Sequence, residues 1–445
     1  MRTSRILLLL PAFLLLSFSP DEDIRIKELN AGGIKVLFKH SPKEIISARL
    51  FIRGGTANYA KEKEGIESLA LAVATEGGTA KHDMTAFATA KEKIGTQIGY
   101  SSSYDYSEMS VSSLTAYWNT SWDLFVEVIN QPLIDQKGFD LIKDRQLSGA
   151  REQEADPDTY VENKAMELSY AGRNYAKIPS GTAKSLAALT LDDIKSHYRK
   201  VLNKNNVFLV VVGNVTEADL LAKVNAAFSS LPAGTTAPAE AKSEIQPGVS
   251  IENRDIATNY IHGTMTLPAL SDPDAIPMRV AMSIMGDKFF VELRTKRSLT
   301  YAPAAYYNTS ASKNPNAVFY ASSTKPKEAL QVMIDQINDV KNNGFKDKEL
   351  KDKKEEFLTG YYSRLETTDA QSLGIGANEI FASWKNFESF MTDVDKVTVA
   401  DMNRVFKKYS NSINWMYLGK ETEVTKGDFK QPQILPGGAK VEKKK

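Results

Sequence analysis

Residues 65–79 read Gly-Ile-Glu-Ser-Leu-Ala-Leu-Ala-Val-Ala-Thr-Glu-Gly-Gly-Thr, and this stretch decides the fold. Its nearly unbroken run of small and apolar residues predicts a helix buried in a core, and the glycine pair near its end predicts a tight turn. Upstream, residues 46–55 read Ile-Ser-Ala-Arg-Leu-Phe-Ile-Arg-Gly-Gly and predict a strand that enters a glycine turn. A strand followed by a core helix indicates a domain in which helices pack against a sheet.

A third stretch, residues 293–301, reads Leu-Arg-Thr-Lys-Arg-Ser-Leu-Thr-Tyr. Together the three stretches resemble the insulinase/pitrilysin-type metallopeptidases, the inverzincins, and the similarity extends over nearly the whole mature chain. In that family the motif H-x-x-E-H places two zinc-binding histidines on one face of a helix, with a general-base glutamate between them. The resemblance implies two related domains that close around a shared cavity.

The zinc-binding residues of the family are absent from this sequence. The resemblance places the motif on Ser68, Leu71 and Ala72, which neither bind zinc nor take a proton from water. It places the third ligand, a glutamate, about two turns before the next proline, where this chain has Ser148 and Gly149. We therefore expect no metal and no cofactor on this chain.

Other candidates for catalysis or metal binding are weak. The four histidines are scattered singly through different predicted elements: His40, His82, His197 and His262. A lone histidine is more often a surface or satisfied core residue than a ligand. Glu67 and Glu76 lie near the degenerate motif, but carboxylates without imidazole form a poor zinc site. Lys81-His82-Asp83 suggests part of a triad, yet no serine stands in a strand–turn–helix elbow.

Arg294 and Tyr301 match a recurrent functional pair of the family, with the spacing Arg-x6-Tyr. The resemblance implies that such a guanidinium and phenol bind the substrate carbonyl and stabilise the oxyanion that forms as water attacks. Considered alone, Arg-Thr-Lys-Arg on a helix is typical of a solvated basic face. The family commonly has glycine before the tyrosine, where this chain has Thr300. A β-branched residue resists positive φ, so we expect a different local turn.

The expected position of this pair depends on a helix break. We predict a helix over residues 289–297 that buries Phe290 and Leu293 and breaks at Ser298. We predict a strand from Tyr301 onward. Such a break can direct the tyrosine and the preceding helical turn into one cavity.

The chain is organised as a repeat. Residues 189–194, Leu-Thr-Leu-Asp-Asp-Ile, start a helix that precedes the strand 207–213. Residues 397–402, Val-Thr-Val-Ala-Asp-Met, do the same before the strand 415–419, at an offset of 208 positions. In both copies the threonine is an expected N-cap followed by an acid in the first turn. The offset predicts two similar domains of about 210 residues.

Both halves mix strands and helices. Residues 106–114 and 316–323 alternate as half-buried strands do, and residues 327–343 place apolar side chains along one helical face. The predicted fold class is therefore α+β, with two homologous domains, each with helices packed on a mostly antiparallel sheet. We assign the segments as follows: 1–19 signal peptide, 20–232 N-terminal insulinase-like domain, 233–248 linker, 249–430 C-terminal insulinase-like domain with the Arg/Tyr pair, and 431–445 disordered tail.

The amino terminus is typical of an export signal. Arg2 and Arg5 precede the apolar run of residues 6–18, which is shorter than the roughly 20 residues that span a bilayer. Ser17 and Ser19 are small residues placed for cleavage, although Pro20 makes the cleavage position uncertain. An uncleaved anchor is the competing interpretation. We expect a periplasmic or secreted protein with no stable membrane span after processing.

The overall composition narrows the possible functions. Lys plus Arg number 56 against 55 Asp plus Glu, so nothing favours nucleic acid or an anionic membrane as a partner. Cysteine is absent, which excludes disulfides, thiolate zinc sites and cysteine nucleophiles.

In the two-chain branch of the family, one subunit carries the zinc motif and the other carries the Arg/Tyr pair. This chain resembles the second kind of subunit. The leading hypothesis is therefore an exported, zinc-less subunit that completes the active site of a zinc-bearing paralogous partner for peptide hydrolysis. The alternatives are a peptide-binding or chaperone-like module, and a structural subunit of protease ancestry. Substrate, cleavage preference, partner identity and homodimer formation are not determined by the sequence.

Overall fold

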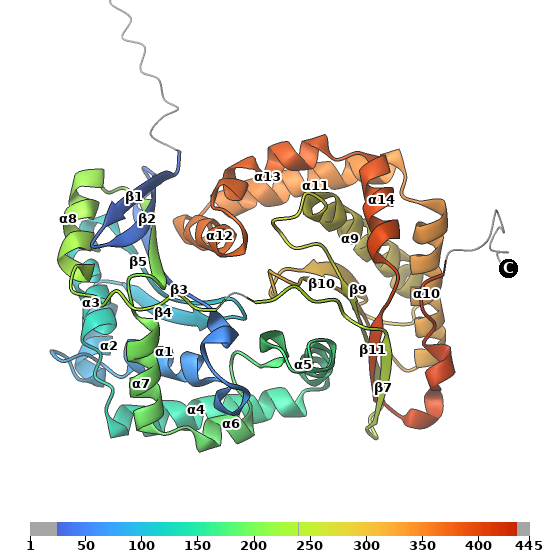
Figure 1. Cartoon of the computed structure of the whole chain (residues 1–445), viewed down its shortest axis with the longest axis horizontal. Helices are drawn as coiled ribbons and strands as arrows, with labels where there is room; N and C mark the ends of the chain where they lie inside the picture. Colours follow the sequence, from blue (N-terminus) through green and yellow to red (C-terminus); the bar gives the residue numbers. More distant parts are fainter. Residues whose placement is uncertain (1–24, 239, 434–445) are drawn as a thin grey trace, which may run out of the picture.

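The computed structural model describes residues 25–433 except residue 239. In this part of the chain, two similar halves lie side by side (Figure 1). The predicted signal peptide and residues 434–445 of the predicted tail lie outside the described residues. In the described ranges no helix combines the length and hydropathy needed to cross a membrane.

The strands of the first half form one sheet in the order β1-β2-β6-β3-β5-β4. Only β2 and β6 are parallel neighbours; the other pairs are antiparallel. All residues of β6 are buried, because helices cover both faces of the sheet at this strand. The strands are β1 (Lys27–Ala31), β2 (Ile34–His40), β3 (Ile45–Arg53), β4 (Gln97–Ser102), β5 (Tyr106–Leu114) and β6 (Val207–Gly213).

The second sheet repeats this topology in the order β7-β11-β8-β10-β9, again with one parallel pair, β7 and β11. The two orders correspond strand for strand once β1 is set aside, which confirms the predicted repeat and the α+β class. The predicted strands 106–114 and 316–323 are β5 and β10. The strands of this sheet are β7 (Gly248–Asn253), β8 (Asn259–Thr266), β9 (Ala304–Asn308), β10 (Asn316–Ser323) and β11 (Asn414–Gly419).

The predicted threonine caps are present in both halves. The Thr190 side chain accepts a hydrogen bond from the backbone amide of Asp193, and the Thr398 side chain accepts the equivalent bond from Asp401. In return, the backbone amide of each threonine donates to the carboxylate of its aspartate.

The helices of the first half are α1 (Ile66–Glu76), α2 (Met84–Lys93), α3 (Trp118–Asn130), α4 (Gln136–Ala155), α5 (Pro157–Ser169), α6 (Ala183–Ala188), α7 (Leu191–Val201) and α8 (Glu217–Phe228). Those of the second half are α9 (Ala275–Phe289), α10 (Pro326–Asn343), α11 (Asp347–Leu365), α12 (Thr368–Phe381), α13 (Lys385–Lys396) and α14 (Val399–Tyr409).

Each half contributes a helix to the sheet of the other half. Helix α12 packs on β3 and β6, and α5 packs on β8 and β11 (Figure 1). Ile375 and Ile380 of α12 belong to a core cluster with Phe51 and Phe208 of the first sheet. At Gly376 an added Cβ would lie 2.0 Å from the Phe51 ring, so the helix approaches the sheet too closely for any side chain. The halves are therefore joined through shared cores.

A buried ion cluster strengthens this junction. Arg49 on β3 forms an ion pair with Glu108 and a second, at 2.6 Å, with Asp369 of α12. Its Nε donates to Ser372 Oγ at 3.0 Å. A buried guanidinium without acceptors destabilises a fold, and these partners supply acceptors to Arg49.

The segment between α8 and β7 crosses from one half to the other (Figure 1). The backbone amide of Ala237 donates to Asn206 in the first half, and that of Ser243 donates to Asn314 in the second. At the other end of the chain, Gln431 forms two hydrogen bonds with the backbone of Ile413. The first residues of the predicted tail are thus attached to the second sheet.

Candidate functional site

Helix α1 is a core helix, as the sequence predicts. Every residue from Ile66 to Thr75 is buried. Of the three positions that carry the zinc motif in the family, Ser68 is 8% exposed, Leu71 1% and Ala72 0%. Leu71 and Ala72 belong to the main hydrophobic cluster of the first half. Apolar packing thus takes the place of metal ligands.

The expected position of the third ligand lies on α4. Ser148 is exposed, and Gly149 faces open space, since an added Cβ there would meet no atom within 4 Å. In the described part of the chain, no group of three or more His, Asp or Glu side chains is placed to hold a metal ion.

Glu67, next to the first motif position, forms a buried polar cluster that sequence reasoning missed. Its carboxylate accepts hydrogen bonds from Asn58 at 2.9 Å and from Ser107 at 2.5 Å. It also lies 2.9 Å from His197 Nε2 on α7, and the His197 ring packs edge-on against Tyr59. The sequence indicates this cluster only by placing an acid within an apolar helix. The partners of Glu67 cannot be recognised from the sequence, because they lie up to 130 positions away.

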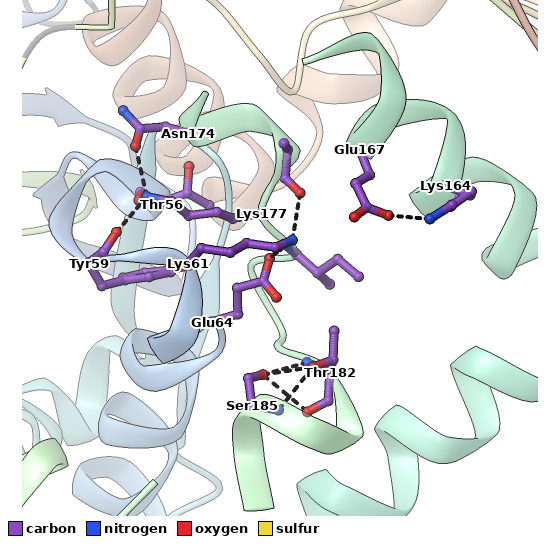
Figure 2. Close-up of polar contacts among 12 residues, drawn as sticks. Thr56, Tyr59, Lys61, Glu64, Lys164, Glu167, Asn174, Lys177, Thr182 and Ser185 are labelled. Carbon is purple, nitrogen blue, oxygen red and sulfur yellow. Dashed lines mark hydrogen bonds and ion pairs between the residues drawn. The ribbon is translucent and has the colours of Figure 1, made fainter. Parts of the chain in front are cut away.

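The loop that precedes α1 is held by two lysines (Figure 2). Lys177 donates to the carbonyls of Thr56 and Tyr59 and to the Asn174 side chain, at 2.5–2.8 Å. Burial lowers the pKa of Lys177. Lys61 forms an ion pair with the buried Glu64 at 2.6 Å, and Glu64 accepts the backbone amide of Ile178. These contacts fix the start of α1 against the segment that follows α5.

The structure brings Arg294 and Tyr301 together. The guanidinium carbon of Arg294 lies 4.4 Å from the centre of the Tyr301 ring and 4.9 Å from that of Phe290. Both distances are within the range of cation–π contacts. Tyr301 is 79% exposed, so the pair lies at the surface of this chain. It belongs to the second half, and Leu293 beside it packs in a core separate from that of α1.

The structure around the pair differs from the prediction in two respects. After α9 the chain forms a π-helix over Phe290–Thr295, in which Leu293 is buried as predicted but Phe290 is 43% exposed. The prediction that Phe290 is buried was wrong, because the wider π-helical turn rotates that side chain outward. The following strand begins at Ala304, not at Tyr301.

The turn between Arg294 and Tyr301 contains one residue with an unfavourable backbone conformation. Ser298, with φ of 50°, is the one non-glycine residue with positive φ in the described ranges. Thr300 is buried and does not need that conformation. The amide of Leu299 donates to the carbonyl of Leu293 at 2.8 Å, which closes the helix end. The positive φ of this turn therefore lies two positions before Thr300.

The charges in this stretch are paired unequally. Lys296 and Arg297 each form an ion pair with Glu292 at 2.5 Å. In the described part of the chain, Arg294 has no ion pair or hydrogen bond to its guanidinium, and the Tyr301 hydroxyl has no hydrogen bond. A solvated basic face does not explain why only Arg294 stacks on an exposed aromatic ring. The arrangement offers two hydrogen-bond donors to an external oxygen.

The remaining sequence candidates do not form a catalytic group. His82 contacts Thr79 and Glu127, whereas Asp83 caps α2 by accepting the amide of Ala86. His262 is buried on β8 without a hydrogen-bond partner for either ring nitrogen among the described residues. Burial lowers the pKa of His262 to about 4, so it is neutral at pH 7.

Comparison with known proteins identifies the family. Residues 35–182 match the model described as insulinase (peptidase family M16), and residues 188–357 match the model described as the peptidase M16 inactive domain. The chain belongs to the insulinase family and has Ser68, Leu71 and Ala72 at the positions of the zinc motif, which confirms the resemblance noted in the sequence.

Relatives support the same grouping. A Helicobacter pylori protein named non-peptidase homolog YmxG is 22% identical over 86% of this chain and 91% of its own length. A peptidase M16 inactive domain from Pseudomonas fluorescens has a TM-score of 0.80 at 22% identity, covering 89% of this chain and 98% of that one. A protease from Helicobacter pylori also has a TM-score of 0.80, at 17% identity, covering 88% and 99%. At these identities the two solved structures show the shared fold alone.

Proposed function

We propose that this chain is the zinc-less subunit of an exported two-chain metallopeptidase, in which it supplies Arg294 and Tyr301 to the active site of a zinc-bearing paralogous partner. The observation that carries the proposal is the stacked, exposed pair of Arg294 and Tyr301, whose donors have no acceptor in the described part of this chain. The partner would hold the zinc ion and the general base that Ser68, Leu71 and Ala72 cannot provide.

The roles follow from the chemistry of peptide hydrolysis. When water attacks a peptide carbonyl, negative charge develops on the carbonyl oxygen; a zinc ion held by the partner would activate that water. A guanidinium and a phenol positioned at that oxygen stabilise the charge by hydrogen bonds that strengthen in the transition state. Stacking of Arg294 on Tyr301 restricts both side chains before the substrate arrives, which reduces the entropy lost on binding.

The partner surface lies around the same pair. Phe290 and Val291 are 43% and 41% exposed, beside Tyr301 at 79%. Large apolar side chains that are clustered and exposed are typical of an interaction surface. Closure of a second, similar chain over this surface would bring a zinc site to Arg294 and exclude water from the pair.

A second candidate function is favoured by the absence of every zinc ligand and by the name of the Helicobacter pylori relative, a non-peptidase homolog. A peptide-binding, chaperone-like or structural subunit would use the same fold without hydrolysis. The surface pair would then bind a peptide carbonyl or carboxylate without a chemical step.

Purification of the chain from its native host under gentle conditions separates the two candidates. A co-purified, zinc-containing chain with an intact H-x-x-E-H motif, together with peptide hydrolysis that neither chain performs alone, would support the heterodimeric peptidase. Peptide binding without hydrolysis in every preparation, and no zinc-bearing partner, would favour the second candidate.

A further inference from the structure

A cavity of about 850 Å³ lies in the second half, between the start of α9 and the helices α12 and α13. A smaller lobe of about 90 Å³ shares part of its lining and extends to α11. The volume of the wide lobe, about 850 Å³, suits a small organic molecule. Because α12 also packs on the first sheet, the cavity adjoins the junction between the halves.

The cavity contains an arginine without a partner. Arg279 on α9 lines both lobes, and its guanidinium carbon lies 4.7 Å from the centre of the Phe390 ring. In the described ranges its guanidinium forms no ion pair and no hydrogen bond, so five N–H donors lack a protein acceptor. Burial lowers the pKa of Arg279 to about 10; Tyr307 opposes this shift, and the neighbouring Arg364 adds to it.

A second arginine strengthens the positive field. Arg364 at the end of α11 also lines both lobes, and its guanidinium carbon lies 5.9 Å from the centre of the Phe390 ring. Its Nε donates to the carbonyl of Gly360 at 3.2 Å, and its two terminal nitrogens have no acceptor among the described residues. The two guanidinium groups thus share one aromatic ring and one cavity.

The acids of the wide lobe are already engaged. Asp393 forms an ion pair with Lys396 at 3.0 Å, and Asp272 accepts the backbone amide of Asp274. Asp401 accepts the backbone amide of Thr398. The described lining of the smaller lobe contains no acid at all, but it contains the amides of Asn378 and Asn386. The lobe that both arginines line therefore has no carboxylate of its own, although Asp272 in the wide lobe has no ion pair among the described residues.

Comparison with Arg49 shows that this fold can satisfy a buried arginine. Arg49 has Glu108, Asp369 and Ser372 as partners, whereas Arg279 has only an aromatic ring. Arg279 is only partly buried, and none of its nitrogens is among the fully buried unpaired atoms, so its donors are accessible from the cavity. Such unsatisfied groups are typical of functional sites, where the ligand supplies what the fold lacks.

We propose that this cavity binds a small organic oxyanion, a carboxylate or a phosphate, between Arg279 and Arg364, with the rest of the ligand against Phe390. Planar guanidinium groups bind both kinds of oxyanion through paired hydrogen bonds. Arg279 and Arg294 are fifteen positions apart along one continuous helical segment, or roughly 22 Å at the α-helical rise per residue. The site is thus distinct from the Arg294–Tyr301 pair and does not depend on the proposed function.

Titration of the purified full chain with inorganic phosphate and with citrate tests the proposal, by calorimetry and by the shift in Tm, against sodium chloride at equal ionic strength. At least one anion should bind saturably and raise Tm. Arg279→Met and Arg364→Met should each weaken that binding by about tenfold or more, since each removes a charged hydrogen-bond donor. The anion that binds identifies the ligand as a carboxylate or a phosphate.

Arg254→Met is the matched control. Arg254 stacks on Tyr160 at 4.3 Å as Arg279 stacks on Phe390, but it does not line the cavity. Its loss should leave anion binding unchanged. Failure of both anions to bind the wild-type chain, or binding that Arg279→Met and Arg364→Met leave intact, would overturn the proposal. If the Arg279→Met variant does not fold, anion binding by the Arg364→Met variant is the test, because Arg364 is exposed.

Discussion

The guanidinium carbon of Arg294 lies 4.4 Å from the centre of the Tyr301 ring, although the helix between them ends and the chain passes through a left-handed Ser298. The π-helical turn and the hydrogen bond from Leu299 to Leu293 place Tyr301, three residues before β9, back over the helix end. A separation of seven positions in sequence therefore becomes direct contact.

If this pair acts in hydrolysis, Arg294→Ala or Tyr301→Phe in the reconstituted two-chain enzyme should lower kcat by about 10²- to 10³-fold, because each removes a donor to the developing oxyanion. The carbonyl is nearly neutral before attack, so kcat should fall more than KM rises. Steady-state kinetics with the zinc-bearing partner in excess provides the measurement.

The same stretch supplies a matched control. Arg297→Ala removes an equal charge that is already paired with Glu292, and Ser68→Ala changes a lost ligand position; neither should alter kcat much. Wild-type turnover by the Arg294 and Tyr301 variants would reduce the pair to a surface contact and leave the chain a scaffold.

The isolated chain should bind no stoichiometric zinc, because Ser68, Leu71 and Ala72 occupy the motif and Ser148 and Gly149 the distal position. Elemental analysis of the purified, chelator-washed chain is the test. One tightly held zinc per chain would show that other residues form a site.

Gly376→Ala should lower the free energy of unfolding by roughly 1–3 kcal/mol, because its Cβ would lie 2.0 Å from the Phe51 ring across the junction of the halves. Gly149→Ala is the control: it is also a helical glycine but faces open space, and it should raise stability by roughly 0.5–1 kcal/mol. Urea unfolding of both variants measures the difference. Equal changes in the free energy of unfolding for the two variants would mean that α12 shifts readily to accommodate the added methyl group.

Acid should destabilise the second half through His262. Its folded pKa of about 4 lies below the unfolded value near 6.5, so the unfolded state binds more protons between these values. Stability contributed by neutral His262 is present above pH 6.5 and is lost as pH falls toward 4, by about 3 kcal/mol in total. His262→Leu should flatten the dependence of unfolding free energy on pH over this range.

A slope of unfolding free energy against pH that His262→Leu leaves unchanged would mean that water or local motion solvates the His262 ring.

The export signal predicted over residues 1–19 should be removed from the mature protein. Cell fractionation and mass determination of the mature amino terminus test this. Recovery of only the full-length chain in membranes would identify residues 6–18 as an anchor.

Much of the fold follows from local pattern. The alternation in residues 106–114, the amphipathic face of α10 and the threonine caps at Thr190 and Thr398 are properties of neighbouring residues, so the sequence predicts them correctly. The absence of zinc ligands in residues 65–79 is likewise readable, because the motif is contiguous.

The sequence is less informative where contacts join distant segments. The placement of α12 on the first sheet, the partners of Glu67 and the isolation of Arg279 all depend on residues far apart in the chain. The exposed Phe290 was predicted wrongly because a π-helical turn changes the phase of side chains that an α-helical period assumes.

The sequence by itself thus determined the two α+β domains, their repeat and the loss of the metal motif, since periodicity, capping and contiguous motifs are encoded locally. Only the tertiary structure decided which charges are paired and which are not. The sequence alone does not distinguish Arg49 from Arg279. In the structure, Arg49 forms ion pairs with carboxylates from other elements, whereas Arg279 packs on an aromatic ring and lines a cavity.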